Sequence, residues 1–157
     1  MQTVLIPTDF TTTPLLLLKH AALSAADKLE VIFMYSTFTS DSITDLLFYS
    51  PQRILQAAIP RDFREGCAIM MNKYPQKISG IRYEVFHGNN ATAFQILADL
   101  NKVDKVLIAR DQPFRLHGYE FNPVSNILAS NIPVEEVAMQ VSPRVNEKDL
   151  IAQLLTS

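Results

Sequence analysis

Cysteine, glycine and long apolar runs are all scarce in this sequence of 157 residues, and each scarcity excludes a class of protein. The single cysteine, Cys67, rules out an intrachain disulfide and any Cys-x-x-Cys metal or redox motif. One cysteine is typical of a reducing compartment, so we expect a cytoplasmic protein. The longest apolar stretches fall far short of the roughly 20 residues that a membrane helix needs. No basic segment precedes the first of them, so we expect neither a membrane span nor a signal peptide.

An excess of charge of one sign is lacking as well. The formal net charge is −2, from 14 basic and 16 acidic residues, which gives no indication of a nucleic-acid partner. Apolar residues make up 48% of the chain, enough for an ordinary core in one domain of common size. We therefore expect one α/β domain over residues 1–141, followed by a C-terminal tail with a short helix over residues 142–157.

Short apolar runs alternate with longer amphipathic segments along the chain. Runs typical of buried strands occupy residues 4–6, 31–35, 81–86, 106–108 and 133–141. Segments with helical spacing occupy residues 15–29, 43–74, 91–102, 124–129 and 146–155, and two prolines, Pro51 and Pro60, divide the second of them. We expect a threonine of residues 11–13 and Asn90 to cap the first and third helices. Strands that alternate with helices predict an open parallel sheet with helices on both faces.

Residues 4–10, VLIPTDF, resemble the first strand and turn of the universal stress protein family. That family opens with an apolar triplet, then a proline and an aspartate, and then a helix. Gly88 after the third strand and the order of elements through Val141 are similar to the family as well. The resemblance implies a Rossmann-like, five-stranded sheet of order 3-2-1-4-5 and a stress-response or regulatory role.

ATP-binding members of that family carry a glycine signature after the fourth strand: Gly-x-x-Gly, nine residues, then Gly-Ser or Gly-Thr. The same spacing here falls on Ala109, Gln112 and the pair Asn122 and Pro123, with Val124 next. Glycines let a backbone approach phosphates, whereas proline removes a backbone donor. The departure predicts a domain that binds no cofactor, ATP included. A nucleotide-binding (ATP or AMP) module with an atypical phosphate loop is the alternative.

The candidate ligand-binding residues lie at strand ends or along this spacing: Thr8, Asp9, Tyr35, Ala109, Arg110, Gln112, Asn122 and Val124. Open α/β sheets bind ligands at the carboxyl edge of their strands. The resemblance implies that Asp9 lies near a ribose and base, while its position also suits a cap on the following helix. Arg110 suits either a bidentate grip on a phosphate or carboxylate, or an ion pair with Asp111 or Asp9.

Other motifs indicate little chemistry. Residues 115–118, RLHG, form a basic loop suited either to bind an anion or to remain solvated. His20 and His87 lack neighbours at metal-ligand spacing, so we expect no metal site. Cys67 lacks an adjacent histidine or lysine and is expected to be a packed thiol. Neither a dinucleotide fingerprint nor a nucleophile–base pair is visible, so we expect no enzymatic activity.

The last predicted strand carries the expected oligomer contact. The resemblance implies a homodimer paired through this strand, on which Val137, Met139 and Val141 alternate with more polar neighbours. An exposed apolar edge strand favours association. Glu135 and Glu136 interrupt the apolar pattern, which leaves a monomer as the alternative.

The predicted C-terminal helix bears one apolar stripe, made of Leu150, Ile151, Leu154 and Leu155. This stripe suits either a cover over the edge of the sheet or a contact with a second subunit. Together these patterns predict a non-enzymatic domain that acts through dimerisation or through a protein partner.

Overall fold

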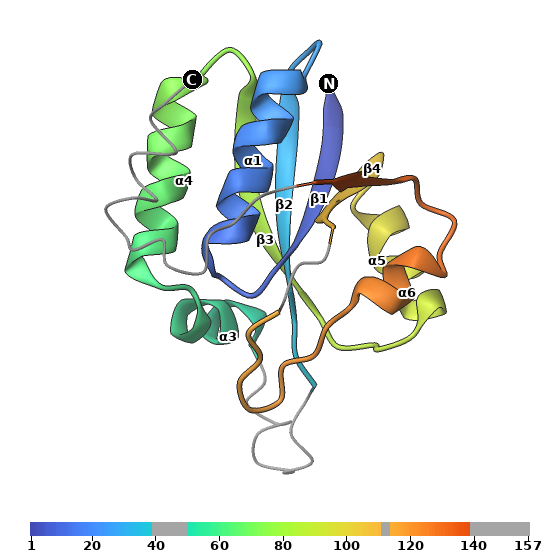
Figure 1. Cartoon of the computed structure of the whole chain (residues 1–157). Helices are drawn as coiled ribbons and strands as arrows, with labels where there is room; N and C mark the ends of the chain where they lie inside the picture. Colours follow the sequence, from blue (N-terminus) through green and yellow to red (C-terminus); the bar gives the residue numbers. More distant parts are fainter. Residues whose placement is uncertain (39–49, 111–113, 139–157) are drawn as a thin grey trace.

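Five parallel strands form the centre of the computed structural model (Figure 1). They are β1 (Gln2–Thr8), β2 (Leu29–Ser36), β3 (Ile78–Phe86), β4 (Lys105–Ala109) and β5 (Val134–Val137). Their order across the sheet is β3-β2-β1-β4-β5, and all neighbours pair in parallel. The predicted fold class and strand order are confirmed.

The structure describes residues 1–38, 50–110 and 114–138. Several predictions concern residues outside these ranges. They are the roles of Gln112 and Asp111, the start of the helical segment at residues 43–49, residues 139–141 of the last predicted strand, and the C-terminal tail and helix at residues 142–157.

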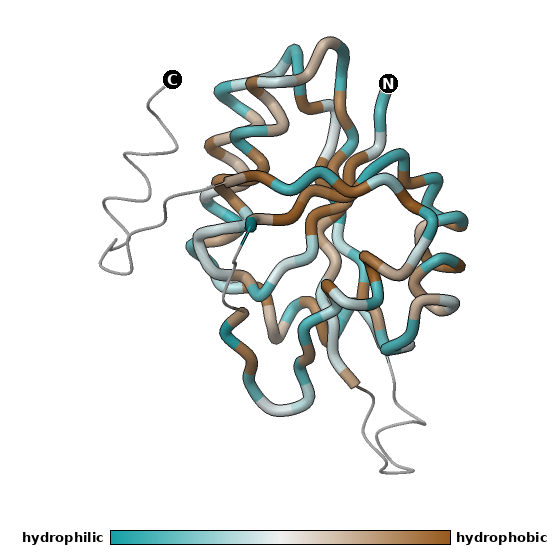
Figure 2. Tube along the Cα trace, turned by 45° about the vertical axis from the view of Figure 1, so that its right-hand side comes forward, coloured by the Kyte–Doolittle hydropathy of each residue, from teal (hydrophilic) through white to brown (hydrophobic). Residues whose placement is uncertain are grey.

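Helices cover both faces of the sheet and close two separate cores. The first core lies under α1 (Thr12–Ser24) and α4 (Arg61–Lys73), with α3 (Pro51–Ala58) at its margin. The second core lies under α5 (Ala91–Leu100) and α6 (Val124–Leu128). Figure 2 shows the hydrophobic residues running through the middle of the molecule along the central strands.

The central strands are the continuous apolar runs of the sequence. Val4, Leu5 and Ile6 of β1 are fully buried, because alternate side chains enter the two cores. The edge strands β3 and β5 keep partly exposed side chains along most of their lengths.

Local signals set the helix starts as predicted at three places. Ser50 accepts the N–H of Arg53 and precedes Pro51, the first residue of α3. Pro60 occupies the N-cap position of α4. The Asn90 side chain accepts the N–H of Ala93 at 2.8 Å and caps α5.

Two predicted boundaries are wrong. The first helix ends at Ser24, not near residue 28, and the Ser24 hydroxyl donates to the carbonyl of His20 in its last turn. The last strand ends at Val137, and Ala138 lies outside it. β5 is short because its partner β4 ends at Ala109, the residue opposite Val137.

Candidate functional site

The turn after β1 is built around Phe10, a non-glycine residue in the left-handed region with φ 59°. The Phe10 ring packs against the rings of Tyr35 and Phe63, with centroids 5.1 and 5.2 Å away. Its N–H donates to the hydroxyl of Thr8 at 2.8 Å. These contacts offset the cost of the left-handed conformation and fix the position of Asp9 at the carboxyl edge of the sheet.

The carboxylate of Asp9 is engaged on both oxygens. Oδ1 accepts the N–H of Thr11 at 3.1 Å and the Thr11 hydroxyl at 2.5 Å. Oδ2 accepts the N–H of Arg115 at 2.9 Å, from a residue far along the chain. Thr11 holds the N-cap position of α1 as expected, but its hydroxyl binds Asp9 and caps no helix N–H. The expectation of a threonine cap by hydrogen bonding is therefore wrong.

Residues 114–122, which we term the strap, run antiparallel to the end of β2. The N–H of Phe38 donates to the carbonyl of Tyr119 at 2.8 Å, and the N–H of Phe121 donates to the carbonyl of Ser36 at 3.1 Å. Between them lies an antiparallel bridge from Thr37 to Glu120. The strap thus crosses the carboxyl edge of the sheet, where open α/β sheets place their ligands.

Glu120 connects the strap to β2 through its side chain. Oε2 accepts the hydroxyl of Tyr35 at 2.5 Å, and Oε1 accepts the N–H of His117 at 2.8 Å. Burial, and next the Glu120 carboxylate, raise the pKa of Tyr35 well above its usual range. Tyr35 therefore stays protonated and remains a donor to Glu120.

Phe121 anchors the strap in the second core. It is buried and packs against Phe38 and Phe86, with ring centroids 4.5 and 5.7 Å away. Phe86 in turn packs edge-on against the buried Phe94 of α5. Beside this anchor, the buried hydroxyl of Ser36 has no hydrogen-bond partner within the described part of the chain.

The described residues aligned with the glycine signature differ from it in the backbone donors they offer. Ala109 is buried at the end of β4. The side chain of Asn122 accepts the N–H of Val124, the first residue of α6, at 3.0 Å. At the end of this spacing, therefore, Pro123 has no N–H to offer and the N–H of Val124 is already bonded to Asn122.

Arg110 points to β5. Its backbone N–H donates to the carbonyl of Val137 at 2.8 Å, which extends the β4–β5 pairing by one residue. Its guanidinium lies 3.8 Å from the carboxylate of Glu136. The expected ion pair with Asp9 is wrong, since Thr11 and Arg115 occupy that carboxylate. The other expected partner, residue 111, lies outside the described ranges.

The remaining candidates have structural contacts. Nδ1 of His87 lies 2.6 Å from the carbonyl of Thr37, and Nε2 of His20 lies 3.4 Å from the carboxylate of Glu135. Cys67 is buried, and burial raises the pKa of its thiol to about 11. Within the described ranges, no group of three or more His, Cys, Asp or Glu side chains is placed to hold a metal.

The structure brings together some of the predicted site residues and adds others. Asp9 and Tyr35 both bond to the strap, Thr8 bonds to the turn at Phe10, and Arg110 contacts Glu136 of β5 instead. Sequence reasoning missed Glu120 and Phe121, because neither belongs to a motif. Their partners Tyr35 and Phe86 lie far away in the sequence, and the spacing of residues near Glu120 and Phe121 does not predict contacts over such a separation.

No family model and no curated protein matches the sequence, so the likeness to known proteins comes from solved structures. The hypothetical protein PH0823 matches with a TM-score of 0.54 and 15% identity, over 90% of this chain and 98% of that one. The hypothetical protein MJ0577, subject of a structure-based assignment of biochemical function, matches with the same TM-score and coverage at 17% identity. A universal stress protein in complex with cAMP matches with a TM-score of 0.48 and 21% identity, over 88% and 98%.

This chain shares its fold, an open sheet of five parallel strands with helices on both faces, with PH0823 and MJ0577. The strand order that the resemblance at residues 4–10 implies, 3-2-1-4-5, is the order observed. A fold hosts many functions, so the roles of individual side chains follow from their own contacts. No helix in the described ranges is long and apolar enough to cross a membrane.

Proposed function

We propose that this chain is a cytoplasmic, non-enzymatic regulatory domain with the universal stress protein fold. It acts by dimerising or by binding a protein partner, and the carboxyl edge of its sheet does not hold ATP. One observation carries the proposal. The strap lies where the family resemblance implies phosphate binding, and its Arg115 and His117 N–H groups donate to the chain's own carboxylates, Asp9 and Glu120.

A nucleotide would have to displace these internal contacts before it could bind. The Arg115 N–H bonds the strap to the Asp9 carboxylate, whereas the His117 N–H bonds Glu120 within the strap itself. Hydrogen bonds to a charged group contribute about 1.5–3 kcal/mol, and the exposed bond to Asp9 contributes at the low end of this range. Displacement would also remove the Tyr35 hydroxyl from Glu120 and the Phe121 ring from its aromatic partners. The incoming phosphates would gain little in return, because Pro123 lacks the N–H that the glycine signature supplies.

The side chains available near the crevice support a non-enzymatic role. The Thr8 hydroxyl accepts the N–H of Phe10, and the Tyr35 phenol is held protonated against Glu120. The thiol of Cys67 is buried, with a raised pKa that suppresses its nucleophilic form. None of these three groups is poised as a nucleophile next to a free base.

Isothermal titration calorimetry of the purified full chain tests the proposal, with ATP, ADP, AMP and cAMP as separate ligands in the presence of Mg²⁺. We expect dissociation constants weaker than about 1 mM, equivalent to a binding free energy of less than about 4 kcal/mol in magnitude. Saturable binding of any of the four with a micromolar constant would overturn the proposal.

A nucleotide-binding module is the second candidate, and it is favoured by the buried hydroxyl of Ser36, which has no partner among the described residues. Asp9, Tyr35 and Ser36 place polar groups at one edge of the sheet, as ligand sites in α/β folds do. On this account calorimetry shows binding, and Asp9→Ala weakens it because Asp9 is the residue that matches the family site.

A further inference from the structure

The outermost strand opposite β5 in the sheet, β3, has one unpaired side to its backbone. β3 pairs with β2 alone. The carbonyl of Phe86, the last residue of β3, accepts the N–H of Thr37, so the backbone groups of Phe86 face β2. Because successive residues of a strand face opposite ways, Ile81, Tyr83 and Val85 direct their N–H and carbonyl groups outward. Within the described ranges no residue bonds to these outward groups.

The sequence of β3 has few of the features that normally protect an open edge. Natural edge strands are commonly short, or they contain proline, lysine or a bulge. β3 has nine residues and contains neither proline nor lysine. Its bulge lies at Ser79, near the start of the strand, and the pairing with β2 is regular from Gly80 to Phe86. This regular stretch offers a continuous edge to a further strand.

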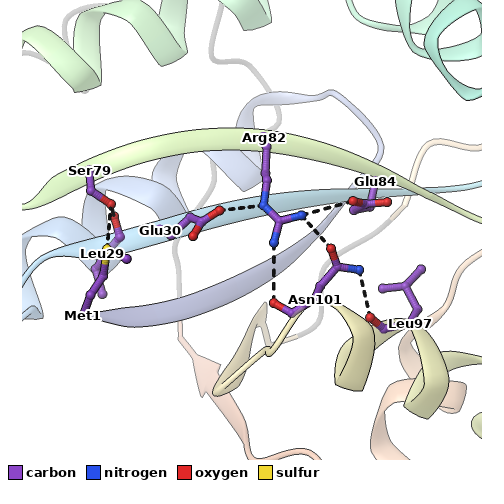
Figure 3. Close-up of polar contacts among 8 residues, drawn as sticks. All are labelled: Met1, Leu29, Glu30, Ser79, Arg82, Glu84, Leu97 and Asn101. Carbon is purple, nitrogen blue, oxygen red and sulfur yellow. Dashed lines mark hydrogen bonds and ion pairs between the residues drawn. The ribbon is translucent and has the colours of Figure 1, made fainter.

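Two opposite charges lie on this edge and contact each other. Nη1 of Arg82 donates to Glu84 of the same strand at 3.1 Å, and Nε of Arg82 donates to Glu30 of β2 at 2.6 Å (Figure 3). The side chains of Arg82 and Glu84 are 38% and 35% exposed. A charged residue protects an edge when the incoming strand places a like charge opposite it. A strand with a carboxylate opposite Arg82 and a cation opposite Glu84 meets no such repulsion.

A second copy of β3 meets this requirement. Around a two-fold axis at Tyr83, two copies pair antiparallel, with Arg82 of each copy opposite Glu84 of the other. The same axis places Ile81 opposite Val85 of the other copy, and Tyr83 opposite itself. These are the outward-facing residues, and each such pair exchanges two backbone hydrogen bonds. An axis at Arg82 or at Glu84 would instead place two like charges opposite each other.

The face of the edge that carries the apolar side chains suits a second copy as well. Ile81 and Tyr83 are partly buried and pack against the first core. Side chains directly opposite each other in an antiparallel pair lie about 4.5–5.5 Å apart at Cβ. The pair would therefore bring Ile81 into contact with Val85, and one Tyr83 ring against the other. The Tyr83 hydroxyl, which donates to Sγ of Cys67 at 3.6 Å, lies on this face too.

We propose that β3 is a self-association surface, at which β3 of one copy pairs antiparallel with β3 of another around Tyr83. The surface is separate from the edge of β5, and it holds or fails independently of the dimer proposed above. Because Arg82 and Glu84 already contact each other within one chain, the gain comes mainly from backbone hydrogen bonds. We therefore expect weak pairing, with a dissociation constant of about 0.1–1 mM.

Disulfide trapping between two single-cysteine variants tests the register of this pairing. In a Cys67→Ala background, we would mix Ile81→Cys with Val85→Cys at about 0.5 mM and separate the products by mass. In the proposed register these two residues lie opposite each other with Cα atoms about 5.5 Å apart, which a disulfide can bridge. Each of them lies about 13 Å along the strand from its own copy.

We expect the mixed dimer to form at least about tenfold faster than either symmetric dimer, because pairing raises the effective concentration of the two thiols. The matched control mixes Ile81→Cys with Leu128→Cys, since Leu128 of α6 is 53% exposed and lies outside this edge. Equal rates for the mixed and symmetric dimers, or a rate no faster than that of the control, would overturn the proposal.

Amide hydrogen exchange provides a second readout that does not depend on β5. The amides of Ile81, Tyr83 and Val85 should exchange at least about twofold more slowly when the protein concentration rises from about 20 µM to about 1 mM. The amides of Arg82 and Glu84 face β2 and should keep their rates. Unchanged rates at all five amides would refute pairing at β3, whatever the state of the β5 edge.

A change of charge at Glu84 tests the contact between the copies. Glu84→Lys places a cation opposite Arg82 of the second copy and should abolish the dependence of exchange on concentration. Glu65→Lys, the same change on α4, should leave this dependence intact. Thermal unfolding of both variants, followed by circular dichroism, separates a lost contact from a lost fold. If Glu84→Lys is folded and keeps the concentration dependence, the proposed register is wrong.

Discussion

Gly88 lies where the chain passes from β3 to α5, and the structure leaves no room for a side chain there. A Cβ atom at this position would lie 2.1 Å from the Cβ of Ala93. We expect Gly88→Ala to lower the free energy of unfolding by about 1–3 kcal/mol, since overpacking displaces the start of α5. Gly80→Ala is the matched control, because a Cβ at Gly80 meets nothing within 4 Å. Its effect should stay within about 0.5 kcal/mol in urea titrations. Equal effects of the two substitutions would contradict the packing described here.

A single arginine joins three elements on the face of α5 (Figure 3). Nε of Arg82 on β3 donates to Glu30 of β2 at 2.6 Å, and Nη1 donates to Glu84 at 3.1 Å and to the side chain of Asn101 at 2.6 Å. Asn101 in turn donates to the carbonyl of Leu97 at the end of α5. Arg82→Met would leave the two carboxylates without their shared cation, at an expected cost of about 1–2 kcal/mol in the free energy of unfolding.

The ion pair between Arg61 and Glu65 provides the control for this element-level contact. It joins adjacent turns of α4 at 2.9 Å, and the Arg61 side chain is 90% exposed. We expect Arg61→Met to change the free energy of unfolding by less than about 0.5 kcal/mol. Urea unfolding of both variants measures the difference, and a larger loss for Arg61→Met than for Arg82→Met would contradict the account.

At the scale of the whole molecule, the open edge of β5 is the expected dimer contact. The N–H groups of Val106 and Arg110 donate to the carbonyls of Pro133 and Val137, so these odd-numbered residues of the last strand face β4. Successive residues of a strand face opposite ways, so the N–H of Glu136 points outward. Sedimentation at micromolar concentration should give the mass of a dimer.

Glu136→Pro should give a monomer with the fold intact, since proline removes the outward donor, and the contact with Arg110 that it also removes is equally lost in Glu136→Ala. Glu136→Ala, which keeps the N–H, should remain a dimer. A monomeric wild type, or a dimeric Glu136→Pro variant, would refute pairing through this edge.

The architecture could be predicted because its signals are local. The runs at residues 4–6 and 106–108 are too apolar for any place but the centre of a sheet, and both are buried there. Pro51 and Asn90 act on the residues next to them, so each marks the start of a helix in the sequence as in the structure.

The candidate site could be predicted only in part, because its contacts are not local. The position of Asp9 at the sheet edge follows from the strand pattern, whereas its bond to the Arg115 N–H depends on the path of the whole strap. That path is fixed by the pairing of Glu120 with Tyr35 and by the burial of Phe121. The partner of Arg110 could not be predicted either, because its contact with Glu136 depends on the register in which β5 pairs with β4.

The central claim is that the strap covers the carboxyl edge of the sheet with its own contacts, and amide hydrogen exchange measured by NMR tests it most directly. The N–H groups of Arg115, His117 and Phe121 donate to Asp9, Glu120 and the carbonyl of Ser36. We predict that these three amides exchange at least about 100-fold more slowly than in an unfolded chain, and that millimolar ATP leaves their rates unchanged. Exchange at the rate of an unfolded chain, or rates that shift when ATP is added, would contradict the account.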